Sequence, residues 1–143
     1  MAKRRRRPSR LTGKVARLVE RERVCRVATA SADGVPHLVP VCHALVDGRI
    51  CFGSGRTGRK VRNLRANPRA TVTVDLYAED WPHLKGVMVQ GTARLVERGP
   101  RFRRLRARLY AKYPQYARDA ALGESDSVIV EVTPTHVFAW GLE

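Results

Sequence analysis

The stretch GSGRTGRKVRNLRANP, residues 53–68, carries the most information about the fold of this chain. Small residues open it, and Asn67-Pro68, a pair that ends helices, closes it. Between them, Val61 and Leu64 fall on one side of a helical repeat. We therefore predict a glycine-rich loop followed by a short helix over residues 59–66.

The start of this predicted helix has the features of an anion site. Arg59 and Lys60 occupy its first positions, where free backbone N–H groups and the helix dipole attract negative charge. Ser54 adds a hydroxyl donor, and Gly53 allows close approach of the backbone. The order of a P-loop is absent. The residues alone leave two interpretations open, a phosphate site and a solvated basic helix.

Segments on both sides of this loop alternate in the manner of β-strands. Two of their turns are Asp33-Gly34 and Asp47-Gly48, and Pro36 and Pro40 favour an edge position for the strand that contains them. Helices are expected at residues 11–22 and from Gly99-Pro100 onward. The pattern predicts a mainly β sandwich or barrel of six or seven strands, at residues 24–30, 35–46, 49–53, 70–77, 86–96, 127–132 and 136–140.

Length and composition indicate one globular domain. The chain has 143 residues, of which 43% are hydrophobic. Its three cysteines favour buried free thiols over a disulfide framework, and the scattered histidines show no metal-ligand spacing. No apolar run is long enough to span a bilayer, and no signal-peptide core is visible, so we expect a cytoplasmic protein.

The charge is strongly positive, at +15. Residues 1–10 hold six of the 28 Lys and Arg residues and no acidic residue, and we expect a flexible basic arm there. The remaining 22 basic and 13 acidic residues give the domain, residues 11–143, a charge of +9. Such a surface suits a phosphate-bearing ligand, and residues 3–10 suit a weak contact with a polyanion.

Several motifs, taken in order, resemble the pyridoxamine 5′-phosphate oxidase-like FMN-binding split barrels. They are DGVPHLVPV (33–41), CFGS (51–54), GRKVRNLRANPRATVTVD (58–75), QGTARLV (90–96) and THVFAW (135–140). The resemblance implies an antiparallel split β-barrel with a few peripheral helices. It also implies a homodimer that holds its cofactor at the subunit interface.

The resemblance also implies which residues bind the cofactor. The strand before the loop and the Arg-Lys pair would bind its phosphate, the segment that begins at His37 would lie along it, and two further positions would approach the flavin ring. The full set is Gly53, Ser54, Arg59 and Lys60 for the phosphate, His37, Leu38, Val39, Pro40 and Val41 along the cofactor, and Gln90 and Trp140 near the ring.

The chain departs from the oxidases of this family after Trp140, because it lacks their C-terminal Arg and His segment. It is more similar to short members that use FMN or the deazaflavin coenzyme F-420, and we expect an oxidoreductase that uses one of these. One alternative is a protein that binds or sequesters flavin or haem without turnover. Another is a nucleic-acid-binding protein that uses the basic arm and the arginine-rich helix at residues 101–108, although only 6% of residues are aromatic.

Overall fold

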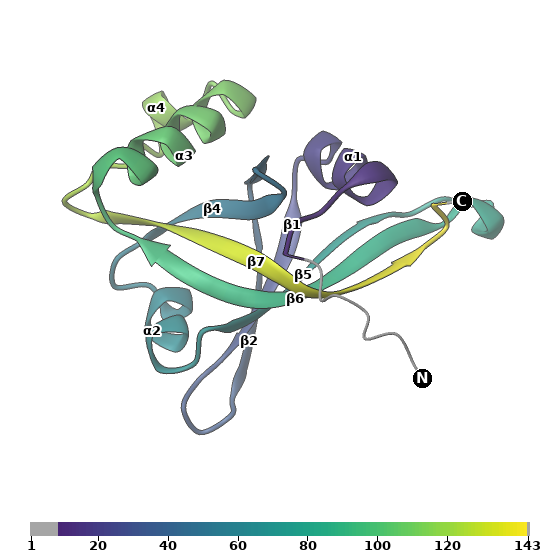
Figure 1. Ribbon diagram of the computed structural model, residues 1–143, viewed down its shortest axis with the longest axis horizontal. Coiled ribbons are helices and arrows are strands. Elements are labelled where there is room, and N and C mark those ends of the chain that lie inside the picture. The colour runs from purple at the N-terminus through teal and green to yellow at the C-terminus, as the bar shows by residue number, and fades with distance from the viewer. Residues whose placement is uncertain (1–8, 143) are drawn as a thin grey trace, which may run out of the picture.

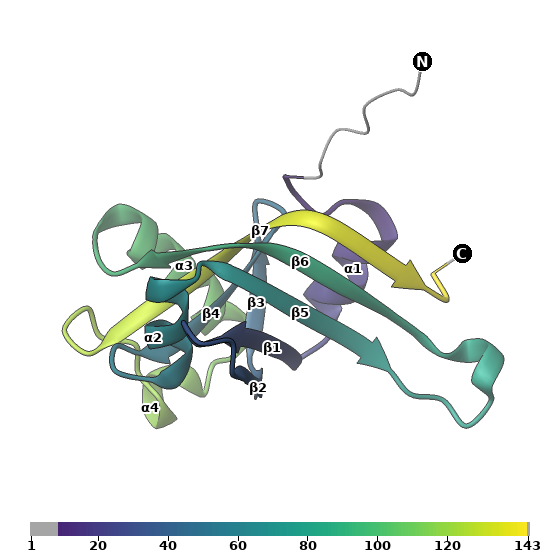
Figure 2. The same ribbon diagram turned by 90° about the horizontal axis from the view of Figure 1, so that it is seen from below.

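The computed structural model describes residues 9–142 as a strongly curled antiparallel sheet with helices around it (Figures 1 and 2). The strands are β1 (Cys25–Ala30), β2 (Pro36–Val41), β3 (His43–Val46), β4 (Arg49–Gly55), β5 (Arg69–Leu76), β6 (Lys85–Val96) and β7 (Ser127–Trp140). The helices are α1 (Gly13–Arg21), α2 (Arg59–Ala66), α3 (Gly99–Lys112) and α4 (Tyr116–Asp119), with a 3-10 turn η1 at Trp81–His83. The predicted fold class, a mainly β split barrel with peripheral helices, is confirmed.

The sheet has the strand order β2-β1-β5-β6-β7-β4-β3, so β2 and β3 form its two edges. We expected one strand over residues 35–46, and this was wrong, because the chain leaves β2 at Val41 and starts β3 at His43. Only Cys42 separates these two edge strands in sequence. The sheet must therefore curl until its edges meet, which makes it a barrel.

Both prolines of β2 lie in an edge strand, as predicted. Pro36 pairs with Ala30 and Pro40 pairs with Arg26 of β1, while the other side of β2 faces no strand in the described chain. Proline has no N–H to donate to a second neighbour, so an edge is the position in a sheet where it costs least. Cys42, at the crossing between the edges, is exposed, so our expectation of burial holds for Cys25 and Cys51 only.

The last strand also differs from the prediction. We expected two closing strands, whereas β7 runs without interruption from Ser127 to Trp140. Pro134 lies within this strand, and the register with β6 shifts there, since Gln90 pairs with His136 and Gly91 pairs with Pro134. A bulge of this kind lets a ladder continue past a residue that cannot donate a hydrogen bond.

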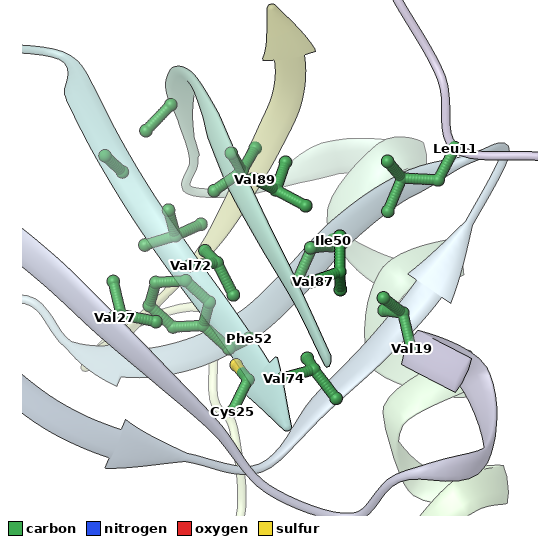
Figure 3. Packing of buried hydrophobic residues seen from close by; sticks show 14 of the residues in the cluster. Leu11, Val19, Cys25, Val27, Ile50, Phe52, Val72, Val74, Val87 and Val89 are labelled. Carbon is green, nitrogen blue, oxygen red and sulfur yellow. The ribbon is translucent and has the colours of Figure 1, made fainter. Parts of the chain in front are cut away.

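The barrel interior is an apolar core built from alternate residues of its strands (Figure 3). Val27, Val72 and Val89 form one row across β1, β5 and β6, and Phe52 is fully buried beside them. One end is covered by α1, whose residues Leu18 and Val19 are buried against this cluster. The helix forms because its apolar residues recur on one face, while its charged residues face outward.

A second core lies under α3. Phe102, Leu105, Leu109 and Tyr113 are buried on one face of this helix and its C-terminal cap, as their spacing predicts. They cover the outer side of β3, β4 and β7, so α3 and α4 lie together on one side of β4 in Figure 1, whereas α2 lies on the other.

Residues 1–8 of the predicted basic arm lie outside the described residues. At the end of that segment, Leu11 donates its backbone N–H to Gly48 at 2.7 Å. Arg10 lies so close to Gly48 that a Cβ on this glycine would stand 2.4 Å from the arginine Cβ. Among residues 9–142, none of the helices has the length and apolarity needed to cross a bilayer.

Candidate functional site

The predicted phosphate-binding segment forms the junction between β4 and α2. Strand β4 ends at Gly55, and Gly58 is the N-cap residue of α2, with its backbone extended. The cap makes no side-chain hydrogen bond, and the first turn of α2 contains no acidic residue. The first N–H groups of a helix have no partner within the helix itself. The free backbone N–H groups at this end of α2 can therefore donate hydrogen bonds to a ligand, because no acidic side chain in the first turn accepts them.

Arg59 and Lys60 make this helix start still more positive. Cations at the positive end of a helix dipole are unfavourable, by about 0.3–1 kcal/mol each when exposed. Neither side chain forms an ion pair within residues 9–142. Lys60 is half-buried, and burial lowers the pKa of its ammonium group. A bound anion would offset the unfavourable placement of two cations at the positive end of the helix dipole. It would also give the half-buried Lys60 ammonium group a charge partner, so the local chemistry fits a phosphate.

The loop that presents these groups is held by Arg56. Its guanidinium donates to the Glu97 carboxylate and to the Glu97 carbonyl, both at 3.3 Å, and also to the Glu124 carbonyl. Its backbone N–H donates to the Asp126 carbonyl at 3.1 Å. Arg65 donates to the same Glu97 carboxylate at 2.7 Å. Arg56 is therefore a structural clamp, which leaves Arg59 and Lys60 as the cations available to a ligand in this loop.

Helix α2 is anchored to the barrel by its opposite face. Val61 and Leu64 are buried, and the Asn63 side chain donates to the Thr29 hydroxyl of β1 at 3.0 Å. The turn between β1 and β2 is close to the start of α2. There, a hydrogen bond from Ser31 is the main cause of a lowered pKa of the Asp33 carboxyl, and the Arg59 charge adds a small contribution.

The glycines of the loop have different roles. A Cβ on Gly53 would stand 2.6 Å from Cδ2 of Leu122, so a larger residue here would require the Leu122 side chain, in the segment that follows α4, to shift. Gly55 has open space around its missing side chain. A Cβ on Gly58 would stand 3.3 Å from the Ser54 hydroxyl oxygen, so that hydroxyl lies at the helix start. The Ser54 hydroxyl therefore lies beside the residue that precedes Arg59 and Lys60.

The residues of β2 alternate between the two faces of the sheet. His37 pairs with Thr29 of β1, the residue that binds Asn63 of α2, so His37 lies on the α2 side. Its Nδ1 atom is buried and lacks a hydrogen-bond partner among the described residues. Val39 and Val41 share the inner face with His37, while Leu38 and Pro40 are exposed on the outer face. The five residues therefore do not form a single surface.

Gln90 lies on the outer face, away from the start of α2. It is exposed in a cavity of about 470 Å³, together with Arg69, Thr71, Thr92 and His136. Sequence reasoning missed these four neighbours. Because Thr71 pairs with Gln90 and Gln90 pairs with His136, the register of β5, β6 and β7 brings them together. The available signal was the alternation of polar residues along strands whose other face is apolar.

Trp140 occupies the far end of this outer face. It pairs with Gly86 at the start of β6, and a Cβ on Gly86 would stand 2.4 Å from the indole ring. Phe138 lies beside it, with ring centroids 5.9 Å apart. Trp140 lies four positions after His136 along β7, which corresponds to about 13 Å. Within one chain, Trp140 therefore does not reach the Gln90 cavity or the start of α2.

One curated relative is similar over most of the sequence. It is the 5a,11a-dehydrotetracycline/5a,11a-dehydrooxytetracycline reductase of Streptomyces rimosus, which is 29% identical over an alignment covering 82% of this chain and 74% of the relative.

Three solved structures show the same fold. The heme storage protein HutZ from Vibrio cholerae matches with a TM-score of 0.77 and 18% identity, over 93% of this chain and 96% of its own. An FAD-binding protein from Mesorhizobium loti matches with a TM-score of 0.72 and 23% identity, over 90% and 94% of the two chains. An F420 reductase matches with a TM-score of 0.69 and 24% identity, over 90% and 98%.

Residues 11–141 match the family model of pyridoxamine 5′-phosphate oxidase. The match spans every helix and strand described above, including the β4–α2 junction and the strands that carry Gln90 and Trp140. On this match, the chain is a member of the pyridoxamine 5′-phosphate oxidase family.

Proposed function

We propose that this protein is an oxidoreductase that binds a flavin-type cofactor through its phosphate at the start of α2. The observation that carries the proposal is the placement of Arg59 and Lys60 at a helix start with no acidic residue in its first turn and no capping side chain. Ser54 supplies a hydroxyl at the same place. FMN and the deazaflavin F-420 both carry a phosphate, and either would supply the hydride or electron transfer when bound.

The reductase activity of the Streptomyces rimosus relative supports redox chemistry over group transfer. The FAD-binding and F420 reductase structures support a flavin or deazaflavin on this fold. FMN is our first choice of cofactor, and its phosphate would be bound by Ser54, Arg59 and Lys60 at the β4–α2 junction. Coenzyme F-420 is the alternative that the same residues would bind.

The protein is further proposed to act as a homodimer, with the cofactor at the subunit interface. Gln90 and Trp140 are on the outer face of the sheet, whereas Arg59 and Lys60 lie at the start of α2. One chain therefore cannot enclose a flavin with all of them. The outer face carries Leu38 and Phe138, with exposures of 66% and 63%. A second copy of the chain would cover these apolar side chains and bring its own Gln90 or Trp140 to the ring.

A cofactor-storage protein is the second candidate, favoured by the similarity to the heme storage protein. The propionates of haem are anions that Arg59 and Lys60 would also bind. The nucleic-acid alternative loses support at α3, because four of the five arginines of this helix, all except Arg108, have partners within the protein. Arg101 and Arg104 bind Asp47, Arg103 lies 3.5 Å from the Glu124 carboxylate, and Arg106 donates to the Leu122 carbonyl.

The deciding experiment is titration of the purified protein with FMN, F-420 and haem, followed by visible absorption and fluorescence. We expect micromolar or tighter binding of FMN or F-420, and oxidation of the reduced complex by an added organic acceptor. If haem alone binds, or a flavin binds without any turnover, the storage function replaces the enzyme. If none of the three binds at micromolar concentration, the proposed function is wrong.

A further inference from the structure

A second group of cations lies far from α2, on the outward face of α1. Lys14, Arg17 and Arg21 follow one another at intervals of three and four residues, which places them in a row along the helix. With a rise of about 1.5 Å per residue, the row is about 10 Å long. Val19, on the opposite face of the helix, is buried in the core, and Leu18, which borders the cationic row, is buried beside it, so the cationic face points away from the core.

This row forms one side of a cavity of about 530 Å³. Its other side comes from Lys85, the first residue of β6, and from Gly141 and Leu142, which follow β7. Figures 1 and 2 both show α1 next to the end of β7. Four cations line the cavity, against a single carboxylate, Glu20.

The second wall is a closely packed turn. Gly141 has a φ of +67°, and a Cβ at this position would stand 2.1 Å from the Leu84 carbonyl oxygen. Only glycine combines this left-handed backbone with such a close approach. The C-terminal segment is therefore held against Leu84 and Lys85, so the Lys85 wall of the cavity is set by backbone packing.

The cations of the cavity differ from those elsewhere in this basic protein. On α3, Arg101, Arg103 and Arg104 each have a carboxylate partner. Within residues 9–142, Lys14, Arg17 and Lys85 have none, and the Arg21 pair with Glu22 is loose, at 3.8 Å. The four like charges outnumber the one carboxylate of the lining, Glu20, so they repel one another, and an anionic ligand would relieve this repulsion.

We propose that this α1 groove binds an elongated small molecule that carries two or more anionic groups, phosphate or carboxylate. The length of the cationic row favours such a ligand over a single phosphate. The volume is within the usual range for small-molecule sites, about 300–1,000 Å³. The lining contains no aromatic residue on which a nucleic-acid base would stack, which favours a small anion over a single strand. The groove is separate from the flavin site proposed above and does not depend on it.

The test uses the full chain with the α2 site removed by the substitutions Arg59→Ala and Lys60→Ala, so that the groove is measured alone. Inorganic tripolyphosphate, suberate and orthophosphate are titrated by calorimetry at low and physiological salt. We expect tripolyphosphate or suberate to bind more tightly than orthophosphate. Adding Arg17→Gln and Lys85→Gln should weaken this binding about tenfold or more, the loss expected for one or two charge-assisted hydrogen bonds.

The matched control replaces two exposed arginines outside the groove, Arg94→Gln and Arg98→Gln, in the same background. It lowers the net charge equally and should change the affinity by less than about twofold, because screened distant charges contribute little. If the groove pair and the control pair of substitutions weakened anion binding equally, the attraction would be non-specific and the proposal would be overturned. It would also be overturned by orthophosphate binding as tightly as the long anions, by tighter binding of a single-stranded oligonucleotide through Arg17 and Lys85, or by no binding at all.

Discussion

Single residues at the start of α2 decide the affinity for a phosphate-bearing cofactor in our proposal. Arg59 presents a planar fork that suits two phosphate oxygens, and Lys60 presents a point charge that burial has partly stripped of water. Both act at a helix end that already favours anions. Arg56, although it belongs to the same basic loop, is used to hold the loop to Glu97.

We predict that Arg59→Ala with Lys60→Ala weakens FMN binding by about 100-fold or more, since each of the two charge-assisted hydrogen bonds contributes about 1.5–3 kcal/mol. Riboflavin, which lacks the phosphate, should bind the variant and the original protein equally. Quenching of flavin fluorescence measures both affinities. Arg62→Ala, one turn further along the same helix and exposed, is the control and should leave both values unchanged. Equal loss for FMN and riboflavin would show that the phosphate is bound elsewhere.

His43 gives the fold a dependence on pH. It is fully buried, its Nε2 atom bonds the Val19 carbonyl at 2.7 Å, and burial lowers its pKa from 6.5 to about 4. The unfolded chain takes up a proton near pH 6.5 and the folded chain does not, so this contribution to stability is present above pH 6.5. It is lost as the pH falls from 6.5 toward 4.

We therefore predict that His43 makes the free energy of unfolding about 2 kcal/mol smaller at pH 5 than at pH 7.5. Urea unfolding at the two pH values measures the difference. His43→Gln keeps a donor toward Val19 but does not titrate, so it should remove this part of the pH dependence. If the variant retains the full difference, other groups cause it.

At the scale of elements, a bulge in β7 at Thr135, opposite Gln90 and Gly91 of β6, shapes the outer face of the sheet. Between Gln90 and Gly91 the register with β7 shifts, opposite Pro134. A Cβ on Gly91 would stand only 2.4 Å from the Thr133 carbonyl oxygen, which belongs to the backbone and cannot move aside cheaply. The same bulge sets the place of Gln90 in its cavity.

Gly91→Ala is predicted to lower the free energy of unfolding by about 1–3 kcal/mol, the usual cost of overpacking. Gly55→Ala, where nothing lies within 4 Å of the added Cβ, is the matched control and should cost far less. Chemical unfolding of the two variants measures the contrast. Similar losses at both positions would indicate that the backbone freedom of glycine, and not the contact with Thr133, is what matters.

At the scale of the whole molecule, the curled sheet separates two surfaces. The inner surface is filled by apolar side chains, and α1 closes one end of it. The outer surface has rows formed by the strand register, one of which runs from Leu38 through Ala28, Thr71 and Gln90 to His136. Exposed Leu38 and Phe138 on this surface suit contact with a second copy.

We predict that the protein sediments as a dimer, and that Leu38→Asp with Phe138→Asp converts it to a monomer. Each introduced aspartate would be buried without a charge partner in the dimer, whereas water would solvate it in the monomer. The same variant should bind FMN more weakly if the cofactor lies between subunits. Ala107→Asp, on the exposed face of α3, is the control and should leave a dimer. A monomeric unaltered protein would remove the interface proposal.

Much of this protein was determined by local sequence. The helix over residues 59–66, the edge position of the strand with Pro36 and Pro40, and the apolar face of α3 all follow from nearest-neighbour periodicity and from the chemistry of proline. The gathering of Ser54, Arg59 and Lys60 follows for the same reason, since they belong to one short segment. In each case the physics acts over a few residues and can be read along the chain.

Only the tertiary structure decided the rest. The crossing at Cys42 between opposite edges, the uninterrupted course of β7 and the cavity around Gln90 depend on pairing between distant strands. The α1 groove likewise needs Lys85 and Gly141 to meet a helix that lies more than sixty residues earlier in the sequence. Strand register sets which side chains become neighbours, and a register is settled by burial across the whole sheet, which no single segment of sequence specifies.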